Sequence, residues 1–301
     1  MGEKRPLNPV EELRRDKLEK LKKCFSELEG YKRNKLTLQY PVFFVPGWTC
    51  EDCAAWKKPY EKIPKKYKEY YKPAKYWIDE IIENKEQAHF IEFTDQESKD
   101  SPSFMKLGEY LKKKLIAITQ ERPINLVGHS MGGLDIRSAI SDVKEPALNT
   151  RNVITVGTPN NGTLEAGLLN WKFVQDMVKK FKKMKDYHII QGCNLYRGSN
   201  PIREINEPKE RLNLLEKIDK FYVFMGLRDS TVKSSPKLKK DGISEDLYEE
   251  KVKIIQTASA EHSGKDGITQ DPRLFLPIIK ILCGIELKDD FNHGYIYRKE
   301  T

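Results

Sequence analysis

The chain of 301 residues has few cysteines and no long apolar run, and each scarcity argues against a class of protein. Its five cysteines are an odd number, so at least one lies outside any intramolecular disulfide. Cys50 and Cys53 form one close pair, and the other three are too scattered to complete a zinc site. We therefore expect no metal, and either two ordinary thiols or a local disulfide at this pair. No apolar run approaches the roughly 20 residues that cross a bilayer, so no membrane-spanning segment is expected.

A concentrated basic patch and a Gly-rich phosphate-binding loop are also missing from the sequence. The net charge is +9, but the lysines alternate with glutamates along segments of helical pattern and do not gather in an arm or a patch. Nucleic acid is therefore not an expected partner, and no cofactor is predicted. The charge is compatible with a weak attraction to anionic membrane surfaces.

The N-terminal segment, residues 1–30, lacks the apolar core of a secretory signal and has the pattern of a charged amphipathic helix. This pattern predicts a cytoplasmic protein as the sequence stands, or a secreted one if a signal peptide has been removed. We expect residues 1–40 to form a charged helical extension. Residues 41–301 are expected to form one catalytic domain, because a chain of this length buries a substantial core.

The most informative segment is Val127-Gly128-His129-Ser130-Met131-Gly132-Gly133. It lies between the apolar run 124–127, which predicts a buried strand, and residues 131–143, whose apolar side chains have mostly helical spacing. Glycines on both sides of a serine at a strand-to-helix turn let neighbouring backbone approach closely and leave the hydroxyl exposed at the tip. Ser130 is therefore the candidate nucleophile. The N–H of Met131 is a candidate donor to an oxyanion that develops during the reaction.

Two later strand-like runs end in loops that carry candidate partners for this serine. Residues 220–226 lead into a loop with Asp229, and residues 251–257 lead into a loop with His262. Asp229 is the best-placed acid to orient a histidine, and Asp241 and Asp246 are alternatives farther from the preceding strand. His262 is the best-placed general base, since it follows a strand end and the other histidines do not occupy such a position: His89, His129, His188 and His293.

An earlier strand-like run, residues 41–45, ends at Pro46-Gly47-Trp48, and residues 153–163 contain a strand followed by a Gly-Thr-Pro turn. From about Pro41 to Gly284, these motifs resemble those of the α/β-hydrolase superfamily, lipases in particular. In that superfamily the nucleophile is followed by an acid and then by a histidine. The resemblance implies that the Trp48 N–H is the second oxyanion donor, although many lipases have His-Gly where this chain has Pro46-Gly47.

Helical patterns at 104–119, 131–143 and 272–283 alternate with the strand-like runs. This alternation predicts an α/β fold with a mostly parallel central sheet flanked by helices, as in the α/β-hydrolases. Residues 163–219 are too long for a plain loop and predict a cap or lid insertion. Its large apolar groups and its lysines at 179–185 fit either an anionic lipid interface or packing on the same domain.

Many aromatic side chains occur in the long connection 49–85, and they fit either an acyl pocket or ordinary core packing: Trp56, Tyr60, Tyr67, Tyr70, Tyr71, Tyr76 and Trp77.

The combined pattern predicts a serine carboxylic-ester hydrolase, a lipase or esterase, that forms an acyl-enzyme on Ser130 without a cofactor. Its expected partner is an ester or lipid substrate, presented in solution or at a membrane or lipid interface. Two alternatives stay open at this point. The same triad of Ser130, Asp229 and His262 suits an acyltransferase with an alcohol or lipid acceptor, and the chain is alternatively a non-catalytic binding protein of the same fold. The sequence fixes neither the acyl-chain length nor the oligomeric state.

Overall fold

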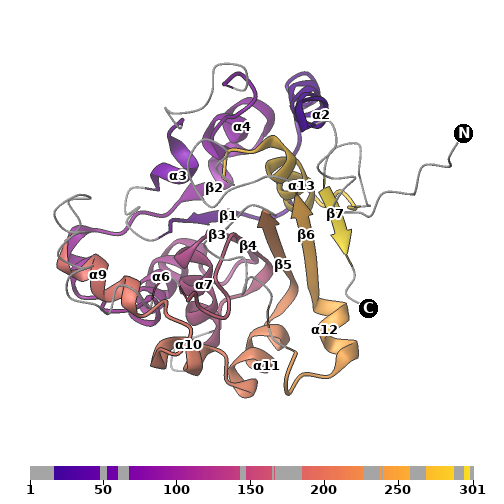
Figure 1. Ribbon diagram of the computed structural model, residues 1–301. Helices are drawn as coiled ribbons and strands as arrows, with labels where there is room; N and C mark the ends of the chain where they lie inside the picture. The colour runs from indigo at the N-terminus through magenta and orange to yellow at the C-terminus, as the bar shows by residue number, and fades with distance from the viewer. Residues whose placement is uncertain are drawn as a thin grey trace, which may run out of the picture.

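A computed structural model describes residues 17–47, 53–59, 68–142, 147–164, 166, 185–226, 238, 240–257, 269–287 and 295–298. Its strands form a seven-stranded sheet in the order β2-β1-β3-β4-β5-β6-β7 (Figure 1). The strands are β1 (Val42–Val45), β2 (Ala88–Phe90), β3 (Ile124–His129), β4 (Thr150–Val156), β5 (Ile218–Gly226), β6 (Val252–Thr257) and β7 (Tyr295–Arg298). All neighbouring strands from β2 to β6 are parallel, and β7 is antiparallel to β6. The predicted mostly parallel sheet is confirmed.

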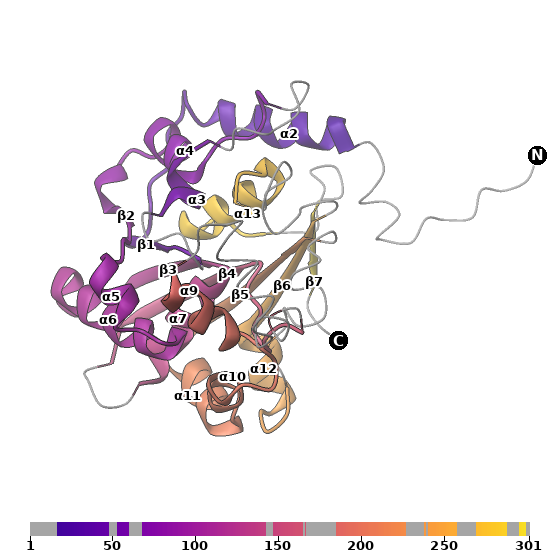
Figure 2. The ribbon, with the colours of Figure 1, turned by 60° about the vertical axis from the view of Figure 1, so that its left-hand side comes forward.

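Helices cover both faces of this sheet (Figure 2). They are α2 (Lys17–Gly30), α3 (Ala54–Lys57), α4 (Ala74–Ile81), α5 (Asp95–Lys99), α6 (Phe104–Thr119), α7 (Met131–Ser141), α9 (Asp186–Cys193), α10 (Asn200–Ile205), α11 (Pro208–Glu216), α12 (Glu245–Lys251) and α13 (Pro272–Leu282). Helices α2, α4 and α13 lie on one face, and α6, α7, α10 and α11 lie on the other.

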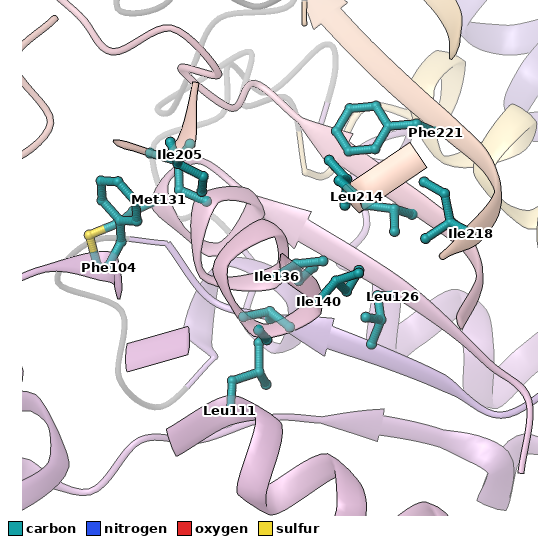
Figure 3. Close-up of a cluster of buried hydrophobic side chains, with 14 of the residues drawn as sticks. Phe104, Leu111, Leu126, Met131, Ile136, Ile140, Ile205, Leu214, Ile218 and Phe221 are labelled. Atoms are coloured by element: carbon teal, nitrogen blue, oxygen red, sulfur yellow. The ribbon is translucent and has the colours of Figure 1, made fainter. Parts of the chain in front are cut away.

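Alternate residues of each strand supply two separate hydrophobic cores. In β1, Phe43 and Val45 pack with α6 and α7, whereas Val42 and Phe44 pack with α4 and α13. The same alternation puts Leu126 of β3 in the first core, where it lies among the residues of α6, α7 and α11 in Figure 3. Strands buried on both faces must be apolar throughout, which is why they appear in the sequence as continuous hydrophobic runs.

The predicted helices agree closely with the structure in their boundaries. The pattern at 104–119 forms α6, and the patterns that begin at Met131 and Pro272 form α7 and α13. Strand β2, which contains His89, is not predicted, because three residues are too few to establish a period. Strand β7 is also missed, since it is four residues long and lies at the antiparallel edge.

The later part of the segment that was expected to form the cap contains α9, α10 and α11, joined by turns. Helix α11 packs against α7 and β5, so it covers the sheet as an ordinary crossover helix does. Helix α9 packs against α5. Residues 167–184, which include most of the lysine-rich segment, lie outside the described residues, and the lid and the domain boundary at residue 40 stay predictions. Among the described helices, none is long and apolar enough to cross a membrane.

Three aromatic residues of the long connection 49–85 are buried in the hydrophobic core. Trp56, Trp77 and Tyr71 are almost fully buried, and the two tryptophans belong to the core shared with α4 and α13. Cys53 carries a buried thiol, and its Sγ lies 3.4 Å from the carbonyl oxygen of Phe44. Cys50, the other member of the close cysteine pair, lies outside the described residues.

Candidate active site

Ser130 lies at the point where β3 ends and α7 begins, at the carboxyl edge of the sheet. Its backbone has φ 54° and ψ −126°, a conformation that non-glycine residues rarely adopt and that costs on the order of 1–3 kcal/mol. Its N–H donates to the carbonyl oxygen of Val156 at 3.0 Å, which ties the turn to the end of β4. The residue is 8% exposed, so the serine is buried in a tightly packed edge and is less accessible than the sequence pattern predicted.

Glycines allow the backbone segments around this turn to touch. A Cβ atom on Gly128 would lie 2.6 Å from the backbone nitrogen of Gly133, and one on Gly132 would lie 2.3 Å from the carbonyl oxygen of Pro46. A Cβ on Gly47 would lie 2.9 Å from the Cβ of Ser130. Because real Cβ atoms do not approach backbone this closely, these positions require glycine. The end of β1 and its following loop are therefore packed directly against the serine turn.

Met131, the predicted oxyanion donor, is the first residue of α7 and is 3% exposed. The N–H groups in the first turn of a helix have no acceptor within that helix, so the position suits donation to an anion. Its side chain packs in the core beside Phe104 and Ile205, as Figure 3 shows. This packing fixes the first turn of α7 below the serine. The other predicted donor, Trp48, lies outside the described residues.

Asp229 and His262 also lie outside the described residues, but the strands that precede them are well placed. Strand β5 ends at Gly226 and β6 ends at Thr257, and these two residues are paired in the parallel register. Since β3 to β6 are consecutive parallel strands, their carboxyl ends share the edge that holds Ser130. The chain therefore leaves both strands at the edge that holds the nucleophile.

The alternative acids lie elsewhere in the structure. Asp246, in the first turn of α12, lines a surface hollow with Arg151 and Asp219 at the amino ends of β4 and β5. That edge is opposite to the one that holds Ser130, so Asp246 is wrong as the triad acid. Asp241 lies beside α11, where its backbone carbonyl accepts a hydrogen bond from Arg211.

Two charged residues of α7 were not predicted as part of the site. The buried guanidinium of Arg137 donates to the carbonyl oxygens of Asn160 and Ile205, both at 2.8 Å, and so connects the nucleophile helix to the turn after β4 and to α10. Burial lowers the pKa of Arg137, and the charge of Arg211 lowers it further. The Asp135 carboxyl is fully buried and makes no hydrogen bond in the described part of the chain, and burial raises its pKa well above the usual range.

The described residues contain no group of three His, Cys, Asp or Glu side chains that could hold a metal ion. At the nucleophile turn, the glycines permit close backbone contacts and the N–H of Ser130 ties the turn to β4. The arrangement suits attack by a serine hydroxyl, with backbone N–H groups available for a developing negative charge.

Solved structures with the same fold include several hydrolases. The Bacillus licheniformis lipase BlEst2 in propeptide form is 17% identical with a TM-score of 0.50, over 83% of this chain and 51% of that chain. Phospholipase PlaB from Legionella pneumophila is 13% identical with a TM-score of 0.42, over 64% of this chain and 40% of that chain. The chain therefore spans about half the length of the first and less of the second.

A carboxylesterase structure from the Thaumarchaeon Nitrososphaera gargenis is 12% identical with a TM-score of 0.48, over 81% of this chain and 89% of that chain. Comparison with curated proteins finds no match. The likeness to the Bacillus lipase supports the α/β-hydrolase fold that the sheet order and the serine turn indicate.

The model of the family described as palmitoyl protein thioesterase matches residues 41–238, which is more than half of the chain. The matched range begins just before β1 and includes the serine turn and the post-β4 turn. With its parallel sheet and its strained Ser130, the chain belongs to the palmitoyl protein thioesterase family, a family of α/β-hydrolases.

Proposed function

We propose that this protein hydrolyses an acyl ester or thioester through an acyl-enzyme formed on Ser130. The observation that carries the proposal is the backbone of Ser130, which is held at φ 54° between β3 and α7 although the residue is not glycine. Strain of this kind persists only where the surrounding structure enforces it, and it is concentrated at functional sites. A serine with a purely structural role in the turn would have no need of it.

In the proposed mechanism, His262 removes the proton from the Ser130 hydroxyl as its oxygen attacks the acyl carbonyl carbon. Asp229 accepts a hydrogen bond from the imidazole and stabilises its charged form. The N–H groups of Trp48 and Met131 donate to the tetrahedral oxyanion, each contributing about 3–4 kcal/mol to the stabilisation of the transition state. The leaving alcohol or thiol departs with a proton from His262. Water then attacks the acyl-enzyme by the same route and releases the acid.

The family description favours a long acyl chain and includes the thioester bond among the candidate substrates. A thiol leaves more readily than an alcohol because its pKa is lower, so the same triad can act on both bonds. We therefore extend the expected substrate class from carboxylic esters to S-acyl thioesters. The name of the Bacillus neighbour, a lipase, supports the oxygen-ester side of this range.

The test is hydrolysis of p-nitrophenyl esters from acetate to palmitate and of an S-palmitoyl peptide by the wild type and by Ser130→Ala. We expect turnover to rise with chain length and to be lost in the variant, while the thermal midpoint of the variant stays within about 2 °C. Equal turnover by Ser130→Ala would contradict the proposal. If an added alcohol captures the acyl group in preference to water, the protein is an acyltransferase and the hydrolase assignment is wrong.

A further inference from the structure

The short segment 53–59 contacts three parts of the chain that are far apart in sequence. Its helical turn, α3, contains Trp56, which is fully buried. The indole Nε1–H of Trp56 donates to the carbonyl oxygen of Val45 at 3.1 Å, at the end of β1. The same ring lies edge-on to the imidazole of His129, with centroids 6.1 Å apart, and His129 directly precedes Ser130. Trp56 thus contacts both the end of β1 and the nucleophile turn.

The third part is the segment that leads into α13. The side-chain amide of Gln270 donates to the carbonyl oxygen of Lys58 at 2.7 Å, across 212 positions of sequence. Gln270 is 5% exposed and Lys58 is exposed, so this hydrogen bond is partly buried. The next residue, Asp271, accepts hydrogen bonds from the backbone N–H and the Nε–H of Arg273, both at 2.9 Å, and both side chains are fully buried. Gln270 is therefore held against the first turn of α13, and through Lys58 it is joined to α3.

The contacts of Trp56 and Gln270 follow closely, in the sequence, on the two residues predicted as oxyanion donor and general base. Trp48 falls between Gly47, which touches Ser130, and Cys53, which begins the 53–59 segment. His262 falls between Thr257, the end of β6, and Gln270. The Gln270–Lys58 hydrogen bond therefore joins the described segment that follows Trp48 in the sequence to the described segment that follows His262.

We propose that Trp56 and Gln270 are positioning residues that hold the end of β1, the nucleophile turn and the start of α13 in fixed relative positions. This inference rests on the proposed function. A displacement of about 1 Å in a catalytic group costs on the order of 100-fold in rate, so two hydrogen bonds that hold these parts have a large effect on turnover. We expect them to leave the binding of the acyl chain largely unchanged, because both side chains are buried within the protein.

The experiment compares each of two variants that lose a proposed positioning hydrogen bond with a control variant altered elsewhere in the protein. Gln270→Met keeps the length of the side chain and removes its donor. Asn84→Ala is its control, because the Asn84 amide also donates to a backbone carbonyl, that of Leu38 at 3.1 Å, and accepts from the Leu38 N–H at 2.9 Å, before the amino end of β1. Trp56→Phe keeps an aromatic ring and removes the indole N–H. Trp77→Phe is its control, because the buried Trp77 Nε1 has no hydrogen-bond partner in the described part of the chain.

We expect Gln270→Met and Trp56→Phe each to lower kcat by about tenfold or more, with KM within about twofold of the wild type. Both control variants keep kcat within about twofold, whatever their effect on the thermal midpoint. We expect the double variant Gln270→Met/Trp56→Phe to lose less than the product of the two single losses, because both residues act through the same segment. The reaction rate of Ser130 with a fluorophosphonate falls in parallel with kcat, since that reaction needs the same base and the same donors.

The inference is wrong if Gln270→Met and Trp56→Phe lower the thermal midpoint but keep kcat and the labelling rate of the folded enzyme. It is also wrong if the control variants lose as much turnover as the positioning variants. Should Gln270→Met fail to fold, Gln270→Ala and Trp56→Phe test the same contacts. Failure of the proposed function gives a different result: Ser130→Ala is then as active as the wild type, or the wild type is not labelled at Ser130.

Discussion

At the scale of single residues, the serine turn depends on positions that admit no side chain. Gly128→Ala would place a methyl group 2.6 Å from the backbone nitrogen of Gly133, and that backbone cannot move without shifting the start of α7. We expect the substitution to lower the free energy of unfolding by about 1–3 kcal/mol and to reduce turnover with it. Chemical denaturation measures the first effect and the ester assay the second.

The matched control is Gly30→Ala at the end of α2, where an added Cβ meets nothing within 4 Å. This substitution is expected to be neutral or to stabilise the protein slightly, by up to about 1 kcal/mol. Equal losses of stability at Gly128 and Gly30 would show that close backbone approach at the serine turn is not the cause.

Asp135 provides a prediction about pH. Burial raises its pKa in the folded state, so at pH values above the usual aspartate range the folded protein keeps a proton that the unfolded chain has lost. The contribution of Asp135 to stability is therefore largest at low pH and is lost as the pH rises toward the folded-state pKa, by up to about 1.4 kcal/mol per pH unit. Asp135→Asn, which stays neutral, should remove this slope.

Urea denaturation of the wild type and of Asp135→Asn between pH 5 and pH 9 measures the effect. We expect the variant to gain stability relative to the wild type as the pH increases. Curves that stay parallel over this range would mean that the buried carboxyl does not retain its proton in the folded state.

The residue scale also shows where sequence reasoning succeeds. Ser130 was predictable because the glycines around it lie at fixed, local spacings that a strand-to-helix turn requires. The roles of Arg137, Trp56 and Gln270 were not predictable, because their partners are backbone carbonyls of segments far away in sequence. A local sequence pattern does not predict which backbone carbonyl will accept a hydrogen bond from a given side chain.

At the scale of elements, α9 is attached to the rest of the protein by buried side-chain hydrogen bonds. The amide of Gln191 donates to the carbonyl oxygen of Ser98 in α5 at 3.1 Å and to that of Ser101, between α5 and α6, at 2.9 Å. Gln191→Ala leaves both carbonyls without this donor, and we expect a loss of about 1–3 kcal/mol in the free energy of unfolding. Denaturant titration of the variant tests this expectation.

Gln96→Ala in the neighbouring α5 is the control, because the Gln96 amide donates to Asp100 at an exposed position. Its effect should stay within about 0.5 kcal/mol. If Gln191→Ala costs no more than Gln96→Ala, the buried amide does not secure α9.

The length and burial of each helix and strand decide whether it could be predicted from the sequence. Helix α6 has a long one-sided apolar pattern, and every residue of β1 and β3 is buried, so the positions of these elements follow from burial. Strands β2 and β7 lie at the two edges of the sheet and have only three and four residues, which leaves no clear period. Helix α11 was assigned to the insertion because its role as a crossover helix depends on contacts with α7 and β5 that the sequence does not show.

At the scale of the whole molecule, the parallel order of β3 to β6 brings the ends of four strands to one edge. The same edge receives the first turn of α7, the turn after β4 that Arg137 holds, and the segment 53–59. Two separate cores, one on each face of the sheet, keep these parts rigid. A hydrolytic site fits this arrangement, since the residues of a triad come from different strand ends and need a fixed frame.

The most direct measurement is the reaction of the wild-type protein with a fluorophosphonate, followed by mass spectrometry of the labelled peptides and by the ester assay on the same sample. We expect one adduct per chain on Ser130, with hydrolysis falling in proportion to labelling, and no adduct on Ser130→Ala. Full labelling of Ser130 with unchanged hydrolysis, or hydrolysis with no reaction at Ser130, would contradict the assignment of Ser130 as the nucleophile.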